Sequence, residues 1–290
     1  MACAFLKTAN TTFPGYDIID NQINTLKERL NDTITSEDAA KRLASHPEAS
    51  STPVELQQRL SGLWALLNET AVKDEAAQPK IISILQAIRQ LPKAKVPTGE
   101  GEDVMDFDDG YYWRELTGWA NDWADAFNAH ASSYLIDHPD DDQRKAAWTN
   151  GCAYTARLAV TGDESLSSYG AGLDRATSAI SEVLEVDTSG EEPKGLEAAA
   201  QLFNHASPEL YRRCRDGPAE GMLTNRDSTW KGQDGYSDAR WRFWFERWTA
   251  VAEKDGFSQR ARELAMQAWN AMKVAESGWL QYTCTTRTVR

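Results

Sequence analysis

Apolar residues recur at helical spacing along most of this chain, and stretches that alternate apolar and polar residues are nearly absent. Spacings of three and four residues place apolar side chains on one face of an α-helix, whereas alternation is typical of a β-strand. One such stripe runs through residues 53–70 and consists of Leu56, Leu60, Leu63, Trp64 and Leu67. The pattern predicts an all-α fold of about ten helices.

These helices are expected on both sides of one acidic loop. The predicted ranges are 17–30, 35–46, 53–70 and 79–90 before the loop, and 111–134, 141–160, 165–184, 195–216, 237–253 and 258–279 after it. The loop, residues 91–110, contains several Pro and Gly residues, which interrupt helices, and six acidic residues.

The helices before the loop have too little length to bury their apolar faces alone. We therefore predict a single helical domain over residues 18–280. Within it, an N-terminal layer, residues 18–90, packs on a tryptophan-rich bundle, residues 111–280. Residues 1–17 are expected to form an irregular extension, and residues 281–290 a frayed C-terminal tail.

The charge and the cysteines restrict the partners and the compartment. The chain has 44 acidic and 31 basic residues, a formal net charge of −13. Nucleic acid is a polyanion bound by clustered Lys and Arg, so it is not expected as a partner. No apolar run is long enough to cross a bilayer, and the first residues lack the features of a secretory signal. The four cysteines are far apart and are expected to be reduced thiols, which favours a cytoplasmic protein.

The chain holds 11 tryptophans, more than a helical protein needs in order to fold. Large aromatic side chains dominate the packing of a core and also line cavities for apolar ligands. The sequence leaves both possibilities open: an oversized aromatic core, or the wall of a large cavity.

One predicted helix combines an aromatic stripe, which includes Trp119 and Trp123, with the polar residues Asn121, Asp122 and Asp125. The two aspartates are one turn apart, as are Asn121 and Asp125, so their oxygens can converge. Such oxygens suit Mg²⁺, which takes one or two carboxylates together with water and substrate phosphate. The alternative is a solvated polar face behind an apolar core stripe.

The next helix carries Trp148 on its apolar side and Asn150 on another face. Asn150 is a further candidate metal ligand. Alternatively, it is buried and bridges helices through hydrogen bonds, since buried polar groups need partners.

The segment 238–248 places Trp241 and Trp244 beside Arg240 and Arg247. Guanidinium groups bind phosphate in a bidentate manner, and indole faces attract cations. In the alternative interpretation, the arginines stack on the tryptophans or pair with acids of other helices, and the rings fill the core.

The last predicted helix carries Trp269, Met272 and Lys273. The first two are candidate substrate-binding residues. Lys273 is a candidate cation for a phosphate group if it points inward, and an ordinary surface lysine if it does not.

Several motifs resemble a fungal family of unknown function, the OpdG-like proteins. They are the segments 63–67, 113–116, 148–158, 235–244 and 268–276. The resemblance covers roughly residues 18–280. In size and helical layout the chain is also similar to the atypical humulene-type sesquiterpene cyclases of fungi. Those enzymes bind farnesyl diphosphate with a two-Mg²⁺ cluster and a lysine on the last helix, a role that the resemblance assigns to Lys273.

We therefore hypothesise a Mg²⁺-dependent terpene cyclase of fungal secondary metabolism that acts on an allylic diphosphate such as farnesyl diphosphate. Ionising this substrate requires cations at the leaving group and a dry aromatic cavity around the carbocation. The catalytic cations would be Lys273, Arg240 and Arg247. The substrate would contact Trp119, Trp123, Trp148, Trp241, Trp244, Trp269 and Met272, and the metal would bind Asn121, Asp122, Asp125 and Asn150.

Two alternatives remain. One is a non-enzymatic helical protein that binds a ligand or a partner, in which the tryptophans form core or interface. The other is a metal-independent isomerase or cyclase with a closed aromatic pocket.

Overall fold

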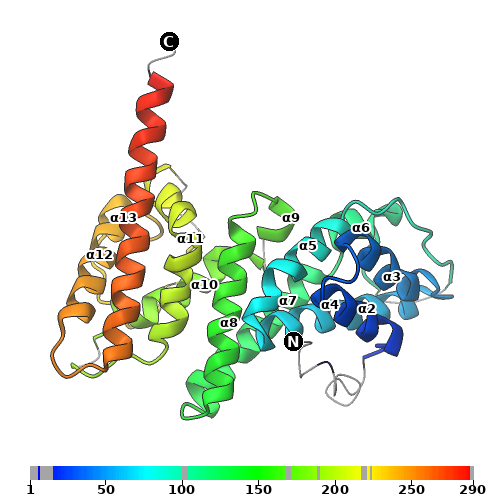
Figure 1. Ribbon diagram of the computed structural model, residues 1–290, viewed down its shortest axis with the longest axis horizontal. Coiled ribbons are helices and arrows are strands. Elements are labelled where there is room, and N and C mark those ends of the chain that lie inside the picture. The colour runs from blue at the N-terminus through cyan, green and yellow to red at the C-terminus, as the bar shows by residue number, and fades with distance from the viewer. Residues whose placement is uncertain are drawn as a thin grey trace. The chain divides into compact units, whose positions relative to one another are not determined.

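The structure is a computed structural model (Figure 1). It describes Leu6 and residues 16–99, 104–167, 171–187, 190–216, 221–222 and 224–287, with side chains as far as residue 278. These residues form helices and no strands, so the all-α prediction is confirmed. The chain divides into two compact units, and we describe each by itself. The first comprises Met1–His130 and Ser168–Ala171, and the second Ala131–Ser167 and Gly172–Arg290.

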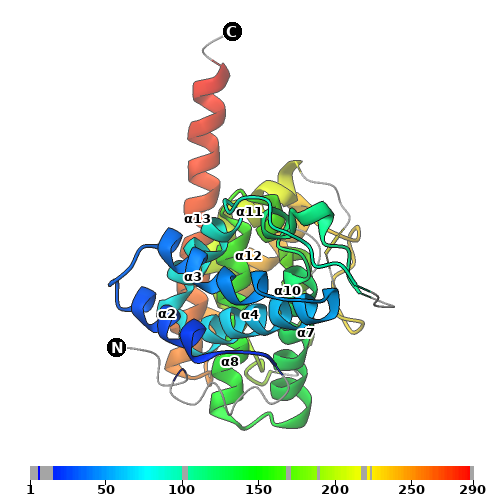
Figure 2. The same ribbon diagram turned by 90° about the vertical axis from the view of Figure 1, so that its right-hand side faces the viewer.

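The first unit is built from helices of different lengths, which short turns join except at the long loop between α5 and α6. Its helices are α2 (Asp20–Leu30), α3 (Ser36–Glu48), α4 (Pro53–Lys73), α5 (Gln78–Ile88), α6 (Tyr112–Glu115) and α7, which begins at Trp119 and ends at Ser132. Helix α3 packs against α2 and α4 (Figure 2), and it also packs against α5. Between α5 and α6, residues 92–99 and 104–107 have no regular secondary structure, as predicted for the acidic loop.

Local sequence signals account for the helix starts. The Thr35 hydroxyl accepts a hydrogen bond from the backbone N–H of Asp38, and the Thr52 hydroxyl accepts one from the N–H of Glu55. Such caps satisfy N–H groups that have no partner inside the first turn. Pro53 at the first turn of α4 lacks an N–H and therefore fits this position.

The prediction of one helix over residues 111–134 is wrong, because the chain breaks between α6 and α7. Leu116 ends α6 in the left-handed conformation (φ 50°), and Gly118 also has a positive φ of 83°. A Cβ at Gly118 would lie 3.2 Å from the terminal methyl carbon of Met105. Glycine therefore permits both the backbone conformation and the close approach of the loop.

The core of the first unit is aromatic and aliphatic. Trp64 and Trp113 meet edge to face, with ring centroids 6.2 Å apart, and both are fully buried. The predicted α4 stripe is also buried, with Leu56, Leu60 and Leu63 at 0% exposure.

The second unit is a helical bundle. Its helices are α8 (Asp142–Ala159), α9 (Glu164–Ser167), α10 (Leu173–Ile180), α11 (Leu196–Asp216), α12 (Asp238–Glu253) and α13 (Gln259–Arg287), and the π-helical turns are Ser133–Asp137 and Ser181–Glu185. Helix α13 packs against α11 and α12, and α11 also packs against α8 (Figure 1).

Two further boundary predictions need correction. The expected helix 165–184 consists of α9, α10 and the π-helical turn, with residues 168–170 outside the described part. The frayed tail was predicted to begin at residue 281. This start is too early, because α13 continues to Arg287. None of the described helices combines the length and the apolar character that a membrane crossing requires.

Candidate functional site

An acidic pocket of about 330 Å³ lies between α4 and α7 in the first unit, and we call it the α4–α7 pocket. Three carboxylates, one amide, one phenol ring and three alanines line it. They are Glu69, Asp122, Asp125, Asn68, Tyr16, Ala65, Ala126 and Ala129. This volume is within the range of small-molecule sites.

Helical spacing explains why these side chains face the pocket together. On α7, Asp122, Asp125, Ala126 and Ala129 are three or four residues apart and share one face. The neighbouring stripe of α7, with Trp119, Trp123 and Phe127, is buried. The helix is therefore fixed by its aromatic stripe, while the adjacent stripe presents acids and alanines.

The segment that carries Tyr16 is held against α4. The carboxylate of Asp17 pairs with Arg59 Nε at 3.0 Å and with His46 Nε2 at 3.2 Å. A Cβ at Gly62 would lie 3.1 Å from the backbone oxygen of Asp17, so glycine allows the segment to lie close to the helix. These contacts place Tyr16 at the pocket.

Asn68 is the most buried polar side chain of the pocket. It is 1% exposed, and its Oδ1 accepts a 3.0 Å hydrogen bond from Nε1 of Trp119. This bond fixes the orientation of the amide, so that Nδ2 points away from the indole. Nδ2 is buried and has no hydrogen-bond partner in the described part of the protein.

Asp122 is the most perturbed acid of the pocket. Burial raises its pKa to about 6; a hydrogen bond from Ser61 opposes this shift, and the neighbouring charge of Asp125 adds to it. Its Oδ2 is buried, and no described group makes a hydrogen bond with it. Strongly perturbed acids in clefts are frequent at functional sites.

Glu69 forms the second acidic feature of the pocket. Its Oε1 lies 2.7 Å from Nε2 of His130, and both side chains are less than one-fifth exposed. A carboxylate has two oxygens with several lone pairs, so one contact with His130 leaves capacity for another donor.

The predicted metal ligands are only partly brought together. Asp122 and Asp125 share the pocket, whereas Asn121 is exposed and does not line it. Asn150 is half-buried on α8, in the second unit. Across the described residues, no three His, Cys, Asp or Glu side chains are grouped so that they could hold a metal ion.

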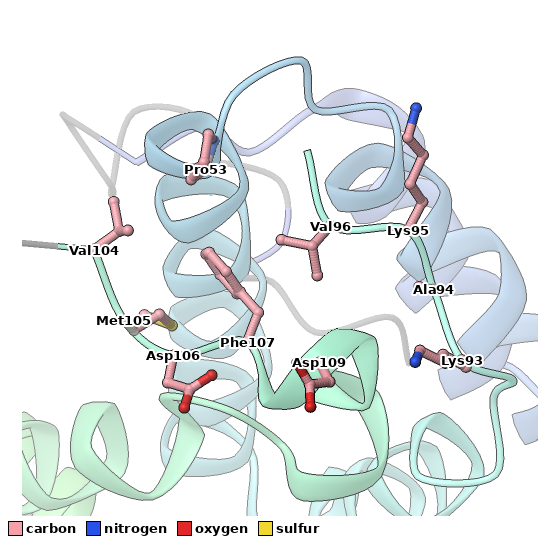
Figure 3. A pocket seen from close by; sticks show the side chains of 10 residues that line it. All are labelled: Pro53, Lys93, Ala94, Lys95, Val96, Val104, Met105, Asp106, Phe107 and Asp109. Carbon is pink, nitrogen blue, oxygen red and sulfur yellow. The ribbon is translucent and has the colours of Figure 1, made fainter. Parts of the chain in front are cut away.

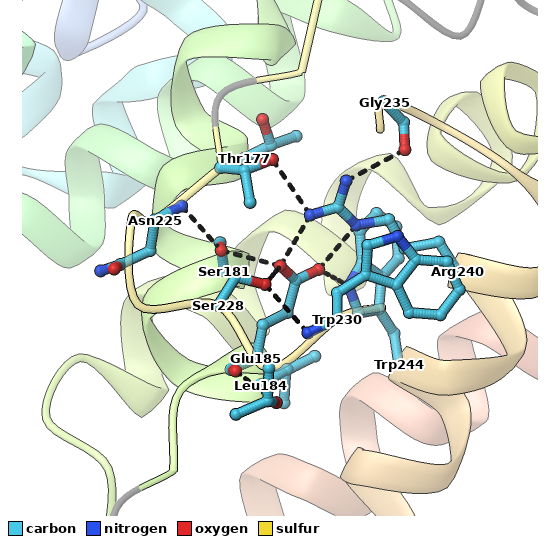
Figure 4. A network of polar contacts seen from close by, with 12 residues as sticks. Thr177, Ser181, Leu184, Glu185, Asn225, Ser228, Trp230, Gly235, Arg240 and Trp244 are labelled. Carbon is cyan, nitrogen blue, oxygen red and sulfur yellow. Dashed lines mark hydrogen bonds and ion pairs between the residues drawn. The ribbon is translucent and has the colours of Figure 1, made fainter. Parts of the chain in front are cut away.

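In the second unit, Arg240 belongs to a buried polar network (Figure 4). Its Nε and Nη2 donate to the two carboxylate oxygens of Glu185 at 2.7 and 2.6 Å, and Nε1 of Trp244 donates to Glu185 at 2.8 Å. The hydroxyls of Ser181 and Ser228 donate to the same carboxylate. Arg240 is therefore paired inside the protein, in agreement with the alternative interpretation of this residue.

The other predicted cations lie elsewhere. Arg247 donates from Nε to the backbone oxygen of Leu184 at 2.8 Å. Lys273 is exposed, and its Nζ lies 3.8 Å from the centroid of the Trp269 ring. Trp269 in turn contacts the Phe245 ring at a centroid distance of 5.2 Å. In the part of the second unit that the structure describes, Arg247 lines a pocket of about 230 Å³ that neither Arg240 nor Lys273 lines.

The predicted substrate-binding tryptophans are packed side chains. Phe203 lies at the centre of one cluster, with its ring centroid 6.1 Å from Trp241, 5.9 Å from Trp244 and 5.6 Å from Trp248. These three indoles are 0% exposed, as is Met272. They form core, one of the two possibilities that the sequence left open.

Trp148 is also packed, although it lies apart from that cluster. It is 1% exposed and contacts Tyr134 with ring centroids 5.8 Å apart. Its ring lies so close to Gly195 that a Cβ there would be 2.6 Å from Cζ3 of the indole. No room for a substrate is left at this face of the ring.

A larger and more open groove of about 550 Å³ lies elsewhere in the first unit (Figure 3). Its centre is apolar, with Pro53, Val96 and Phe107, while Lys93 and Asp109 lie on its border. The groove has both charge signs, and none of its described side chains has a buried polar atom without a partner, so it gives no indication of a ligand class.

Sequence reasoning missed Asn68, Glu69 and His130. The signal for the first two was available, because Asn68 and Glu69 are polar residues that directly follow the apolar run 63–67 of α4. Sequence reasoning also did not identify Glu185 as the partner of Arg240.

Comparison with known proteins gives a family and no activity. A family model described as "Protein of unknown function (DUF3632)" matches residues 64–248. No curated protein and no solved structure matches the chain.

Proposed function

The chain belongs to the DUF3632 family, whose function is unknown, and from its own site we propose that it is a binding protein for a small organic cation. The observation that carries this proposal is Oδ2 of the partly buried Asp122 carboxylate, a buried atom that has no partner among the described residues, in a pocket shared with Asp125 and Glu69. A cation would relieve both the burial of Asp122 and its repulsion by Asp125.

The charge of the pocket disfavours an anionic ligand, because no Lys or Arg is among the described residues that line it. The size of the pocket and its walls favour an organic cation over a bare metal ion. A volume of about 330 Å³ accommodates a ligand with a carbon skeleton, and Ala65, Ala126 and Ala129 offer apolar surface for it.

The Mg²⁺-dependent cyclase has less support. Arg240 and Arg247 bond to groups of their own unit, and Lys273 is at the surface. The cyclase remains a prediction with a direct test: incubation with farnesyl diphosphate and Mg²⁺, followed by analysis for hydrocarbons. A product would support it, and no product from farnesyl, geranyl or geranylgeranyl diphosphate would remove it.

Calorimetric titration of the purified chain with n-butylamine, n-butanol and n-butyrate tests the cation proposal. These probes have similar size and differ in charge. We expect binding of the amine only, and at least about a tenfold loss of affinity in Asp122→Asn, since one charge-assisted contact is worth about 1.4 kcal/mol or more. Asp38→Asn is the matched control, because Asp38 is an exposed acid on α3.

Equal binding of all three probes, or no binding of the amine, would overturn the proposal. A titration with Mg²⁺ alone distinguishes a site for an organic cation from a metal site. If Mg²⁺ binds in an Asp122-dependent manner and the amine does not, the pocket is a metal site and the Mg²⁺ prediction gains support.

A further inference from the structure

The pocket of about 230 Å³ that Arg247 lines lies along one side of α12, and we call it the α12 pocket. Four of its lining residues belong to α12 or to its C-cap and are three or four positions apart, so their side chains share one side of the helix. They are Arg247, Ala250, Val251 and Lys254. The rest of the lining consists of Val183, Asp187, Gly190, Pro193 and Phe257.

The guanidinium of Arg247 is held in place and keeps unused donors. Its Nε donates to the backbone oxygen of Leu184 at 2.8 Å, and Nη2 lies 3.4 Å from the backbone oxygen of Val186. Capping of these carbonyls accounts for Nε and Nη2. Nη1 has no hydrogen-bond partner in the part of the chain that the structure describes. A guanidinium that the fold has already oriented loses little freedom when it binds a carboxylate.

Lys254 brings a second cation to the α12 pocket. A Cβ at Gly190 would lie 3.8 Å from Nζ of Lys254, so the ammonium group lies near this lining residue. Among the described residues, neither Lys254 nor Arg247 forms an ion pair with a carboxylate, although Asp187 also lines the pocket. Two cations and one acid leave one positive charge, which suits a ligand with a single negative charge.

The other walls of the α12 pocket are largely apolar. Val183 is 1% exposed, Val251 is 9% exposed, and Pro193 is also buried. Phe257 is half-buried and adds an aromatic side chain. These walls suit a small molecule with an apolar body. A phosphate group fits less well, because it carries about −1.5 to −2 charges at pH 7 and has no apolar surface.

We propose that the α12 pocket binds a small organic molecule that has one carboxylate and a compact apolar body. The carboxylate contacts Arg247 and Lys254, and the apolar body lies against Val183, Val251 and Phe257. This anion site lies in the second unit and is independent of the cation site proposed for the α4–α7 pocket, which lies in the first.

Calorimetric titration of the purified chain with benzoate, benzyl alcohol, benzylamine, acetate and inorganic phosphate tests the proposal. The first three probes have similar size and differ in charge, acetate lacks the apolar body, and phosphate is a compact anion. We expect benzoate to bind at least about tenfold more tightly than any other probe, because only benzoate combines one negative charge with an apolar body.

Two variants locate the site. Arg247→Gln should weaken benzoate binding at least about tenfold, because it removes a charge-assisted contact. Lys254→Gln should weaken it about threefold, since Lys254 is exposed and its charge is screened by water. Lys41→Gln, at an exposed position of α3, is the matched control and should leave the affinity unchanged. If Arg247→Gln does not fold, as judged by circular dichroism, Lys254→Gln decides.

Each other outcome contradicts the proposal. If benzyl alcohol binds as tightly as benzoate, charge plays no part in recognition. If acetate or phosphate binds as tightly, the apolar walls are not used. Absence of benzoate binding overturns the proposal outright. Asp122→Asn should not change benzoate binding, and a loss in that variant without a loss in Lys254→Gln would place benzoate outside the α12 pocket. The amine titrations of the α4–α7 pocket are not affected by any of these results.

Discussion

The guanidinium of Arg240 and the carboxylate of Glu185 form a two-point ion pair, with 2.7 Å from Nε to Oε1 and 2.6 Å from Nη2 to Oε2, and both side chains are 0% exposed. Burial alone would raise the pKa of Glu185, but hydrogen bonds from Arg240, Ser228 and Trp244 together hold it below its ordinary value. The pair joins α12 to the π-helical turn that ends α10. Arg240 therefore stabilises the second unit from within.

Loss of the Glu185 charge should destabilise the protein strongly. In Glu185→Gln, Arg240 keeps its charge at a fully buried position, and removing one partner of a buried pair typically costs about 3–5 kcal/mol. Denaturant unfolding followed by circular dichroism measures the change. Glu246→Gln, at an exposed position of α12, is the control and should change stability by less than about 0.5 kcal/mol. A small effect of Glu185→Gln would contradict the structural role of the pair.

Asp122 should make the protein less stable as the pH rises from about 4 to about 6. Its pKa is about 6 in the folded protein and about 3.9 in an unfolded chain, so the folded state binds the proton more tightly between these values. Stability from this group is therefore present at low pH and is lost as the pH passes through the folded pKa.

Asp122→Asn removes this dependence, because asparagine is always neutral. The variant should be more stable than the wild type above pH 6, by about 1–3 kcal/mol, and nearly equal to it at pH 4. Urea unfolding of both proteins at pH 4.5 and 7.5 checks this. A stability difference that is the same at both pH values would show that Asp122 does not titrate in this range.

The affinity for an amine should rise with pH, whereas the stability that Asp122 contributes falls as the pH rises. An ammonium group stabilises the ionised form of Asp122, so the affinity should rise between pH 5 and pH 7 and level off above it. The groups that act on Asp122 are Asp125 on its own helix and Ser61 on α4, and Glu69 of α4 lines the same pocket. Titrations in two buffers of different ionisation enthalpy should reveal proton release on binding at pH 6, and none at pH 8.

Glycine is required at position 195 for two separable reasons. Gly195 has a positive φ of 81°, and a Cβ there would lie 2.6 Å from the Trp148 ring. Gly256 also has a positive φ, 92°, with nothing within 4 Å of the added atom. Gly195→Ala should therefore cost about 1–3 kcal/mol more than Gly256→Ala, since only the first adds a clash to the backbone strain. Equal losses in thermal or denaturant unfolding would show that the Trp148 contact is adaptable.

The sequence was sufficient for the fold because helix formation follows from local spacing. The stripe of α4 and the caps at Thr35 and Thr52 involve residues within one or two turns of each other. The break at Gly118 was missed because neither the left-handed Leu116 that ends α6 nor the close approach of the loop residue Met105 to Gly118 can be read from helical spacing. A tertiary contact of this kind leaves no trace in the periodicity of the helix itself.

The site was predictable only in part, because some of its residues are brought together by tertiary contacts. Asp122 and Asp125 share a helix face, so their proximity follows from spacing alone. Glu69 reaches the pocket from α4, and Glu185 reaches Arg240 across 55 residues of sequence. Whether a cation is free for a ligand or neutralised inside the fold depends on such partners, which single-helix patterns do not encode.

Lys273 provides the clearest test of the role that the family resemblance assigned to it. Its ammonium lies 3.8 Å from the centre of the Trp269 ring at an exposed position of α13. An exposed cation–π contact of this kind contributes about 0.5–1 kcal/mol, so Lys273→Ala should lower the free energy of unfolding by no more than that. Lys273→Arg, which keeps the charge over the ring, should restore most of it. If Lys273 instead binds a diphosphate leaving group, inorganic pyrophosphate with Mg²⁺ should raise the melting temperature of the wild type and not that of Lys273→Ala. From its surface position we expect no difference between the two proteins.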